Sequence, residues 1–192
     1  MKKNLITAVL MTLATTILLG IIYPLVVTGL AQVLFPRQAN GQLLAVEGRV
    51  VGSRIIGQAF SGASYFHSRP SAAGYGYQAD NSAGSQLGPT NHVLLDRVRV
   101  DAAALQTENP TKPVPIDLVT TSASGLDPEI TPAAAAFQIP RIAKARGLSE
   151  EDVEKLVARH TAGRQLGFLG EPRVNVLELN LELDGQSVTV QR

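Results

Sequence analysis

The sequence contains no cysteine among its 192 residues. This absence excludes a disulfide framework, a thiolate zinc site, an iron–sulfur cluster, a cysteine nucleophile and a lipidated N-terminal cysteine. Charge is also scarce, since charged residues make up 17% of the chain and the net charge is +1. Such a balance provides neither a basic field for nucleic acid nor an acidic tail. We therefore predict that the protein has no nucleic-acid partner.

Several catalytic and cofactor motifs are missing as well. There is no glycine-rich loop ending in Lys-Ser or Lys-Thr, no Rossmann glycine fingerprint and no His-Glu-x-x-His pair. The three histidines, His67, His92 and His160, lie far apart in the sequence, which disfavours a metal site. The sequence therefore predicts no metal site and no catalytic residue, and it identifies no cofactor-binding motif.

Charge is entirely absent from residues 4–36, a run of 33 residues. A membrane-spanning helix needs about 20 apolar residues, whereas the apolar region of a signal peptide has only about 7–15. The length therefore favours a retained anchor over a cleaved signal. Lys2 and Lys3 precede the run and only Arg37 follows it closely. Because lysine-rich flanks stay in the cytoplasm, we expect the N-terminus inside and the following domain outside.

The sequence thus divides into two predicted parts. Residues 1–36 are predicted to form a cytoplasmic N-terminus and a single transmembrane helix. Residues 37–192 are predicted to form a soluble domain outside the membrane, which in a bacterium means the periplasm or the cell exterior. The second part holds 15 of the 17 basic residues and all 16 acidic ones, so its net charge is −1. It is long enough to bury a core of its own.

The apolar run carries two further features. Small residues recur every four positions, which favours close packing against another helix in the lipid. These helix-packing candidates are Ala8, Thr12, Thr16 and Gly20. Pro24 lacks an amide proton and is expected to kink or break the helix near its outer end.

The soluble domain is predicted to be mixed α+β. Thr131-Pro132 marks a helix start and Gly147 its end, and Ser149 caps a following helix. Residues 174–183 alternate between apolar and polar, and Asp184-Gly185 is a hairpin signal. The expected elements are short strands within residues 38–60, helices over 93–106, 132–146 and 150–163, a short strand over 116–119, and a C-terminal antiparallel pair over 174–190.

Residues 61–92 form a long segment rich in Gly, Ser, Ala, Tyr, Asn and Gln. Long ordered loops are often functional, and tyrosine among small polar residues is typical of recognition surfaces. We interpret the segment as a recognition loop, with a flexible spacer as the alternative. Its candidate partner contacts are Tyr65, Arg69, Tyr75 and Tyr77.

The segment Ser124-Gly125-Leu126-Asp127-Pro128 is first interpreted as a structural turn, because Asp followed by Pro favours turns. Ser122, Ser124 and Asp127 also allow an alternative, a membrane-anchored periplasmic serine hydrolase. A serine nucleophile would need a base and an orienting acid, however, and no Gly-x-Ser-x-Gly elbow is present.

Five motifs together resemble the C subunit of the Kdp potassium-transporting ATPase, the KdpC family. The resemblance extends from the anchor to about Leu183. Two positions depart from the family pattern, Gln86 where Asn is common and Glu129 where His is common. The motifs are Tyr65-Phe66-x-Ser68-Arg69-Pro70-Ser71-Ala72, Gly88-Pro89-Thr90-Asn91, Ser124-Gly125-Leu126-Asp127-Pro128, Arg141-Ile142-Ala143 and Arg173-Val174-Asn175-Val176-Leu177-x-Leu179-Asn180.

This resemblance implies an accessory, non-catalytic subunit of an inner-membrane potassium pump. The implied partners are a channel-like potassium subunit, a P-type ATPase subunit and a small F subunit, besides membrane lipid. ATP and K⁺ are then expected to act at the level of the complex, and the family is described as a catalytic chaperone that raises the pump's affinity for ATP. Asn91, Ser124 and Asp127, which lie within the quoted motifs, are further candidates for partner contact.

Overall fold

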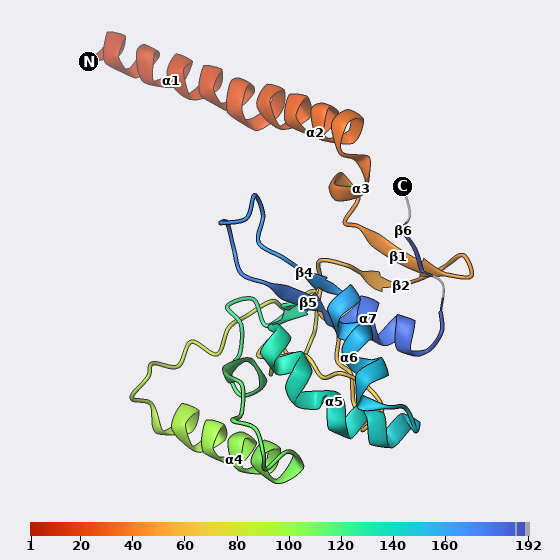
Figure 1. The fold of residues 1–192 in the computed structure, drawn as a ribbon. Coiled ribbons are helices and arrows are strands. Elements are labelled where there is room, and N and C mark those ends of the chain that lie inside the picture. The colour runs from red at the N-terminus through yellow and green to blue at the C-terminus, as the bar shows by residue number, and fades with distance from the viewer. Residues whose placement is uncertain (187, 191–192) are drawn as a thin grey trace. The chain divides into compact units, whose positions relative to one another are not determined.

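A computed structural model describes residues 1–186 and 188–190 of the chain (Figure 1). Contacts divide the chain into two compact units, of which the first spans residues 1–43 with residue 190 and the second spans residues 44–189. The described chain has both helices and small sheets, as predicted for an α+β fold.

The first unit is dominated by one long helical stretch. It comprises α1 (Lys2–Ile17), a π-helical turn η1 (Leu18–Ile22) and α2 (Tyr23–Leu34), and α3 (Pro36–Ala39) follows. Within the 33 residues from Lys2 to Leu34, an 18-residue window reaches a mean hydropathy of 2.4, and the helices have no buried residue. Their length and composition are sufficient to cross a membrane.

Of the kink or break predicted at Pro24, the break is wrong, because the helix continues to Leu34. The turn just before the proline is widened instead. The amide of Tyr23 donates to the carbonyl of Leu18, five residues back. Proline inside a helix clashes with the preceding turn and cannot donate a hydrogen bond, and a π-turn is a common way to absorb such a defect.

The described residues form two three-stranded sheets. The first has the order β2-β1-β6 and contains β1 (Leu43–Val46), β2 (Arg49–Ser53) and β6 (Val188–Val190). The second has the order β3-β5-β4 and contains β3 (Glu129–Ile130), β4 (Thr161–Ala162) and β5 (Arg173–Asn175). Both of its pairs are antiparallel, with Val174 opposite Ile130 on one side and Thr161 on the other.

Helices α5 (Pro132–Arg146) and α6 (Glu150–Arg159) pack against each other, and α5 also contacts β5 (Figure 1). Thr131 and Ser149 cap them by accepting the amide protons of Ala134 and Asp152, as predicted. The main core lies between these helices and the second sheet. Its largest fully buried side chains include Phe66, Phe137, Ile142, Val153, Val174 and Leu179.

The loop prediction for residues 61–92 is confirmed, because the segment has no helix or strand before α4 (His92–Glu108). The helix predicted over residues 93–106 is α4. The helix that follows Ser149 ends at Arg159, earlier than predicted. The strand predicted over residues 116–119 is wrong, because Ile116–Leu118 is a 3-10 turn (η2).

The C-terminal hairpin prediction is also wrong. Val176–Leu183 is a helix, α7, and the side chain of Asn175 begins it by accepting the amide proton of Glu178. Asp184-Gly185 terminates this helix, and β6 pairs with β1 rather than with residues 174–183. Because α7 buries two faces, its apolar residues are too closely spaced to reveal a helical period. Val176 and Leu179 join the main core, and Leu177 and Leu181 pack with Leu44.

Candidate functional site

The turn at Ser124-Gly125-Leu126-Asp127 brings together segments that lie far apart in the sequence. Gly125 is buried with a φ of +67°, and a Cβ there would lie 2.5 Å from the carbonyl oxygen of Ala83 and 2.7 Å from the amide nitrogen of Ala73. Its own carbonyl accepts a 2.6 Å hydrogen bond from the Ser71 hydroxyl. Only glycine combines this backbone conformation with such close packing. The turn therefore fixes residues 61–92, which we call the Tyr-rich loop, onto the rest of the domain.

Arg69 connects the same loop to this turn. Its Nη1 lies 3.2 Å from Oδ2 of Asp127, and its other nitrogens donate to the carbonyls of Thr120 and Thr121. Oδ1 of Asp127 accepts the amide proton of Glu129, where β3 begins. Arg69, which the sequence offered as a partner contact, thus braces the loop internally.

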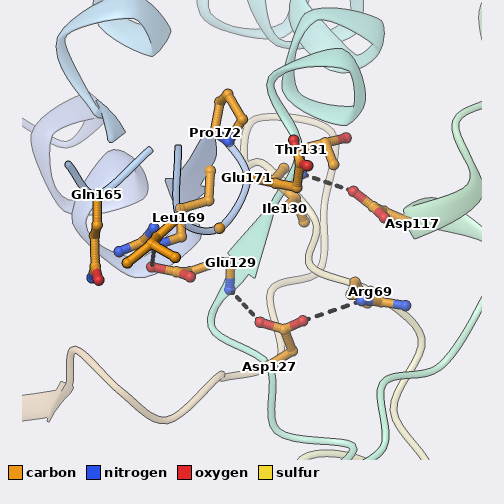
Figure 2. A pocket seen from close by; sticks show the side chains of 12 residues that line it. Arg69, Asp117, Asp127, Glu129, Ile130, Thr131, Gln165, Leu169, Glu171 and Pro172 are labelled. Atoms are coloured by element: carbon orange, nitrogen blue, oxygen red, sulfur yellow. Dashed lines mark hydrogen bonds and ion pairs between the residues drawn. The ribbon is translucent and has the colours of Figure 1, made fainter. Parts of the chain in front are cut away.

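A polar hollow of about 540 Å³ opens beside this ion pair (Figure 2). Figure 2 shows Asp127 between Arg69 and Glu129, and Asp117 beside the start of α5. Arg173 pairs with Glu129 at 2.9 Å, and the buried Asp117 accepts the amide proton of Thr131 at 2.7 Å. The hollow is thus lined by both signs of charge. Its lining residues are Arg69, Asp117, Asp127, Glu129, Ile130, Thr131, Gln165, Leu169, Gly170, Glu171, Pro172 and Arg173.

The three tyrosines of the loop differ in their environments. Tyr75 is fully exposed. Tyr77 is partly buried, and its hydroxyl donates to the carbonyl of Arg69 at 2.5 Å. Burial raises the pKa of the Tyr77 phenol above its ordinary value. Tyr65 stacks under the guanidinium of Arg146 at 5.0 Å and donates to Asp184. Tyr75 is therefore the tyrosine of this loop that is most available to a partner.

The remaining candidates have local structural roles. Asn91 caps α4 by accepting the amide proton of Val93. The hydroxyls of Ser122 and Ser124 accept the amide protons of Gly125 and Leu126. Within residues 1–186 and 188–190, neither hydroxyl has a histidine or a carboxylate as a hydrogen-bond partner, so the arrangement needed for a serine hydrolase is not assembled.

Two further predictions from the sequence stay untested. The helix-packing candidates Ala8, Thr12, Thr16 and Gly20 are all exposed on the long helix, and their role stays a prediction. In the described part of the chain, no group of three or more His, Asp or Glu side chains is arranged to hold a metal ion.

Sequence reasoning missed one exposed feature, the connection between β4 and β5. We call residues 164–171 the apolar tip, because Leu166, Phe168 and Leu169 are 82%, 69% and 47% exposed. Figure 1 shows this connection projecting beyond the ends of both strands. The sequence does contain a signal for this exposed feature. It is the apolar run Leu-Gly-Phe-Leu-Gly between Arg164 and Glu171, which lies outside any predicted helix or strand.

Comparison with known proteins extends over almost the whole chain. The family model described as "K+-transporting ATPase, c chain" (KdpC) matches residues 5–185. The chain belongs to the KdpC family. The Potassium-transporting ATPase KdpC subunit of Koribacter versatilis is 66% identical over 185 residues, covering 96% of both chains. Those of Acidobacterium capsulatum and Rhodopseudomonas palustris (strain BisB18) are 62% and 55% identical, covering 95% and 96% of this chain and 98% of each relative.

Membership of the KdpC family also gives meaning to the two departures from its motifs. Gln86 has a φ of +52°, a left-handed conformation that Asn adopts more readily than Gln. Glu129 accepts from Arg173 across the antiparallel β3–β5 pair and lines the hollow. Position 86 thus requires a left-handed backbone conformation, and Glu129 provides an ion pair at the hollow.

Proposed function

We propose that the chain is a non-catalytic accessory subunit of a K⁺-transporting ATPase complex. In this role it supports the assembly and activity of a channel-like potassium subunit and a P-type ATPase subunit, beside a small F subunit. The KdpC match over residues 5–185, which includes both the apolar helix and the folded domain, carries the proposal. The local structural roles of Ser122 and Ser124 support a non-catalytic assignment.

The topology that we propose has the N-terminus in the cytoplasm, one membrane crossing and the domain in the periplasm. Its support is the helix Lys2–Leu34 with Lys2 and Lys3 at its start. External protease added to spheroplasts is expected to digest the domain and to spare the N-terminus. A domain that is protected until the membrane is permeabilised would contradict this orientation.

In this topology the domain and the cytosolic nucleotide lie on opposite sides of the membrane. We infer that ATP and K⁺ act at the level of the complex, and that any increase in ATP affinity is transmitted through the pump subunit. Four carboxylates line the hollow against two guanidinium groups, and this excess of negative charge also disfavours a triphosphate. Titration of the full-length chain in detergent with ATP is expected to give no saturable binding, and micromolar binding would contradict the inference.

The direct test compares two complexes, one with the full-length chain and one with a chain that ends at residue 43. We expect the truncated chain to reduce both retention of the large subunits and K⁺-stimulated ATP hydrolysis. Equal retention and equal ATPase activity in the two complexes would contradict the accessory role of the domain.

A further inference from the structure

The first residues of the Tyr-rich loop are held by charged donors from α5. We call residues 62–65 the loop entry. Nη1 of Arg141 lies 2.7–3.3 Å from three of its carbonyl oxygens, those of Gly62, Ala63 and Tyr65. Nε of Arg146 donates to the fourth carbonyl, that of Ser64, at 2.7 Å. The loop entry has no helix or strand of its own, so side-chain contacts of this kind hold it in place.

The ring of His67 contacts the same group of carbonyls. Its Nε2 lies 2.9 Å from the carbonyl oxygen of Gly62, which also accepts a hydrogen bond from Arg141. A carbonyl oxygen only accepts, so Nε2 carries the proton of the neutral ring, and Nδ1 is the nitrogen that takes up a second proton. Because both side chains touch one oxygen, Nε2 of His67 and Nη1 of Arg141 are at most about 6 Å apart. Protonation of the ring therefore places two positive charges side by side.

The surroundings of His67 favour its neutral form while the loop entry is in place. Burial lowers the pKa of His67 most, and the charge of Arg141 on α5 lowers it further. The Gly62 carbonyl and Glu108, at the end of α4, act in the opposite direction. Glu108 is already engaged, however, because its carboxylate accepts from Nε of Arg141 at 2.7 Å. The carboxylate therefore compensates a second positive charge only in part.

The chain on either side of the loop entry limits how far a change there spreads. Phe66 is fully buried, and the side chain of Asn180 bonds both its backbone amide and its carbonyl, at 2.9 and 3.0 Å. The side chain of Gln138 bonds the two backbone groups of His67 in the same way. At the other end, Gly62 has a φ of +99° and free space around its Cα. The loop entry thus lies between a conformationally free glycine and a fixed phenylalanine, and it can open while the core stays packed.

We propose that His67 is an acid-sensitive latch, in which protonation at Nδ1 drives the ring away from Arg141 and releases the loop entry from α5. In the neutral form the ring donates to the Gly62 carbonyl and the latch is closed. In the protonated form the two cations repel each other, and the contacts to the carbonyls of the loop entry open. Opening frees Tyr65, one of the candidate partner contacts.

The latch goes beyond the accessory role proposed above and does not depend on it. Because the closed state lowers the pKa of His67, opening increases as the pH falls below the ordinary histidine value of about 6.5. It levels off below the lower pKa of the closed state. With the domain outside the membrane, the latch responds to the pH of the outer medium, and this consequence alone rests on the proposed topology.

Hydrogen exchange of the full-length chain in detergent tests the latch, with each rate divided by that of an unstructured peptide at the same pH. The reporter is the Tyr65 amide, which bonds to the Gly62 carbonyl. We expect its protection to fall as the pH decreases below about 6.5, by up to about tenfold per pH unit, the limit for one proton. The amides within α5 are the internal reference and should stay protected. Unchanged protection at Tyr65, or an equal loss within α5, would overturn the proposal.

Two variants assign the effect to one histidine. His67→Gln keeps a donor for the Gly62 carbonyl but does not titrate, so protection at Tyr65 should no longer depend on pH. His92→Gln is the matched control, because His92 is exposed at the start of α4, and it should keep the pH dependence of the parent chain. A pH dependence at Tyr65 that persists in His67→Gln would assign the opening to another group and sink the latch.

A spectroscopic measurement on the parent chain needs no variant. The sequence contains three histidines, so the ring protons of His67 can be followed by NMR as the pH is lowered. We expect the ring signals of Tyr65 to shift together with the titration of His67. Titration of His67 with unchanged Tyr65 signals would contradict the release of the loop entry. All of these experiments use the chain alone, so their failure leaves the accessory role and the topology standing.

Discussion

The guanidinium of Arg69 lies 3.2 Å from the carboxylate of Asp127, although 58 positions separate the two residues in the sequence. The pair joins two of the motifs that define the KdpC resemblance. Because Asp127 also accepts the amide proton of Glu129, the contact connects the Tyr-rich loop to the start of β3. This partly buried ion pair is thus one of the contacts that position the loop, together with the hydrogen bond from Ser71 to the carbonyl of Gly125.

Replacing Arg69 by Met is therefore expected to destabilise the domain. The substitution removes the Asp127 ion pair and the hydrogen bonds to Thr120 and Thr121. We expect a loss of about 1–2 kcal/mol in the free energy of unfolding, because carbonyl groups lose charged donors that bulk water only partly replaces. Circular dichroism of the full-length chain in detergent measures this loss. Arg99→Met is the control, since its pair with Asp96 is highly exposed and contributes little.

The sequence was sufficient to predict helices whose ends are determined by neighbouring residues. Thr131, Pro132 and Gly147 define both ends of α5, because a cap, a proline and a left-handed glycine act within one turn of the helix. The uncharged run similarly predicts the long helix from Lys2 to Leu34. These features need no information from the rest of the chain.

The sequence was insufficient where tertiary packing decides. Residues 174–183 alternate like a strand, yet Leu177 packs with Leu44 while Leu179 enters the main core, and only a helix buried on two faces satisfies both. The Arg69–Asp127 pair could not be predicted either, because the neighbouring sequence does not distinguish an arginine that braces a loop from one that binds a partner. The KdpC resemblance supplied the family, but not these contacts.

Substitutions of Tyr75 and Tyr77 are expected to have different effects, one on assembly of the complex and the other on stability of the domain. Tyr77→Phe removes the hydroxyl that donates to the carbonyl of Arg69, so we expect a loss of about 1 kcal/mol in the free energy of unfolding. Tyr75→Ala removes a fully exposed ring, so stability should not change. If the loop contacts a partner, Tyr75→Ala should reduce subunit retention or K⁺-stimulated ATP hydrolysis. Unchanged assembly and activity in Tyr75→Ala would exclude this tyrosine from the contact.

The small-residue stripe of the long helix gives a prediction about assembly within the membrane. Thr16→Leu or Gly20→Leu adds volume where two helices would approach closely, so either is expected to weaken retention of the partner subunits. Ile17→Leu, on a neighbouring face, is the control that conserves side-chain volume. Subunit retention after detergent extraction measures the effect. An equal loss for Ile17→Leu and Gly20→Leu would reject the stripe as an interface.

His67 makes the stability of the domain depend on pH. Burial, and then the nearby charge of Arg141, lower the pKa of His67, and the Gly62 carbonyl and Glu108 offset this only in part. The unfolded chain therefore binds a proton more readily than the folded chain. The contribution of His67 to the free energy of unfolding is fully present above the ordinary histidine pKa of about 6.5. It is lost as the pH decreases from there towards the lower pKa of the folded state. His67→Gln keeps a donor for the Gly62 carbonyl without titrating, so its unfolding temperature should decline less over this range. Circular dichroism melts of the full-length chain in detergent measure the two slopes, and parallel slopes in the parent and the variant would assign the pH dependence to other groups.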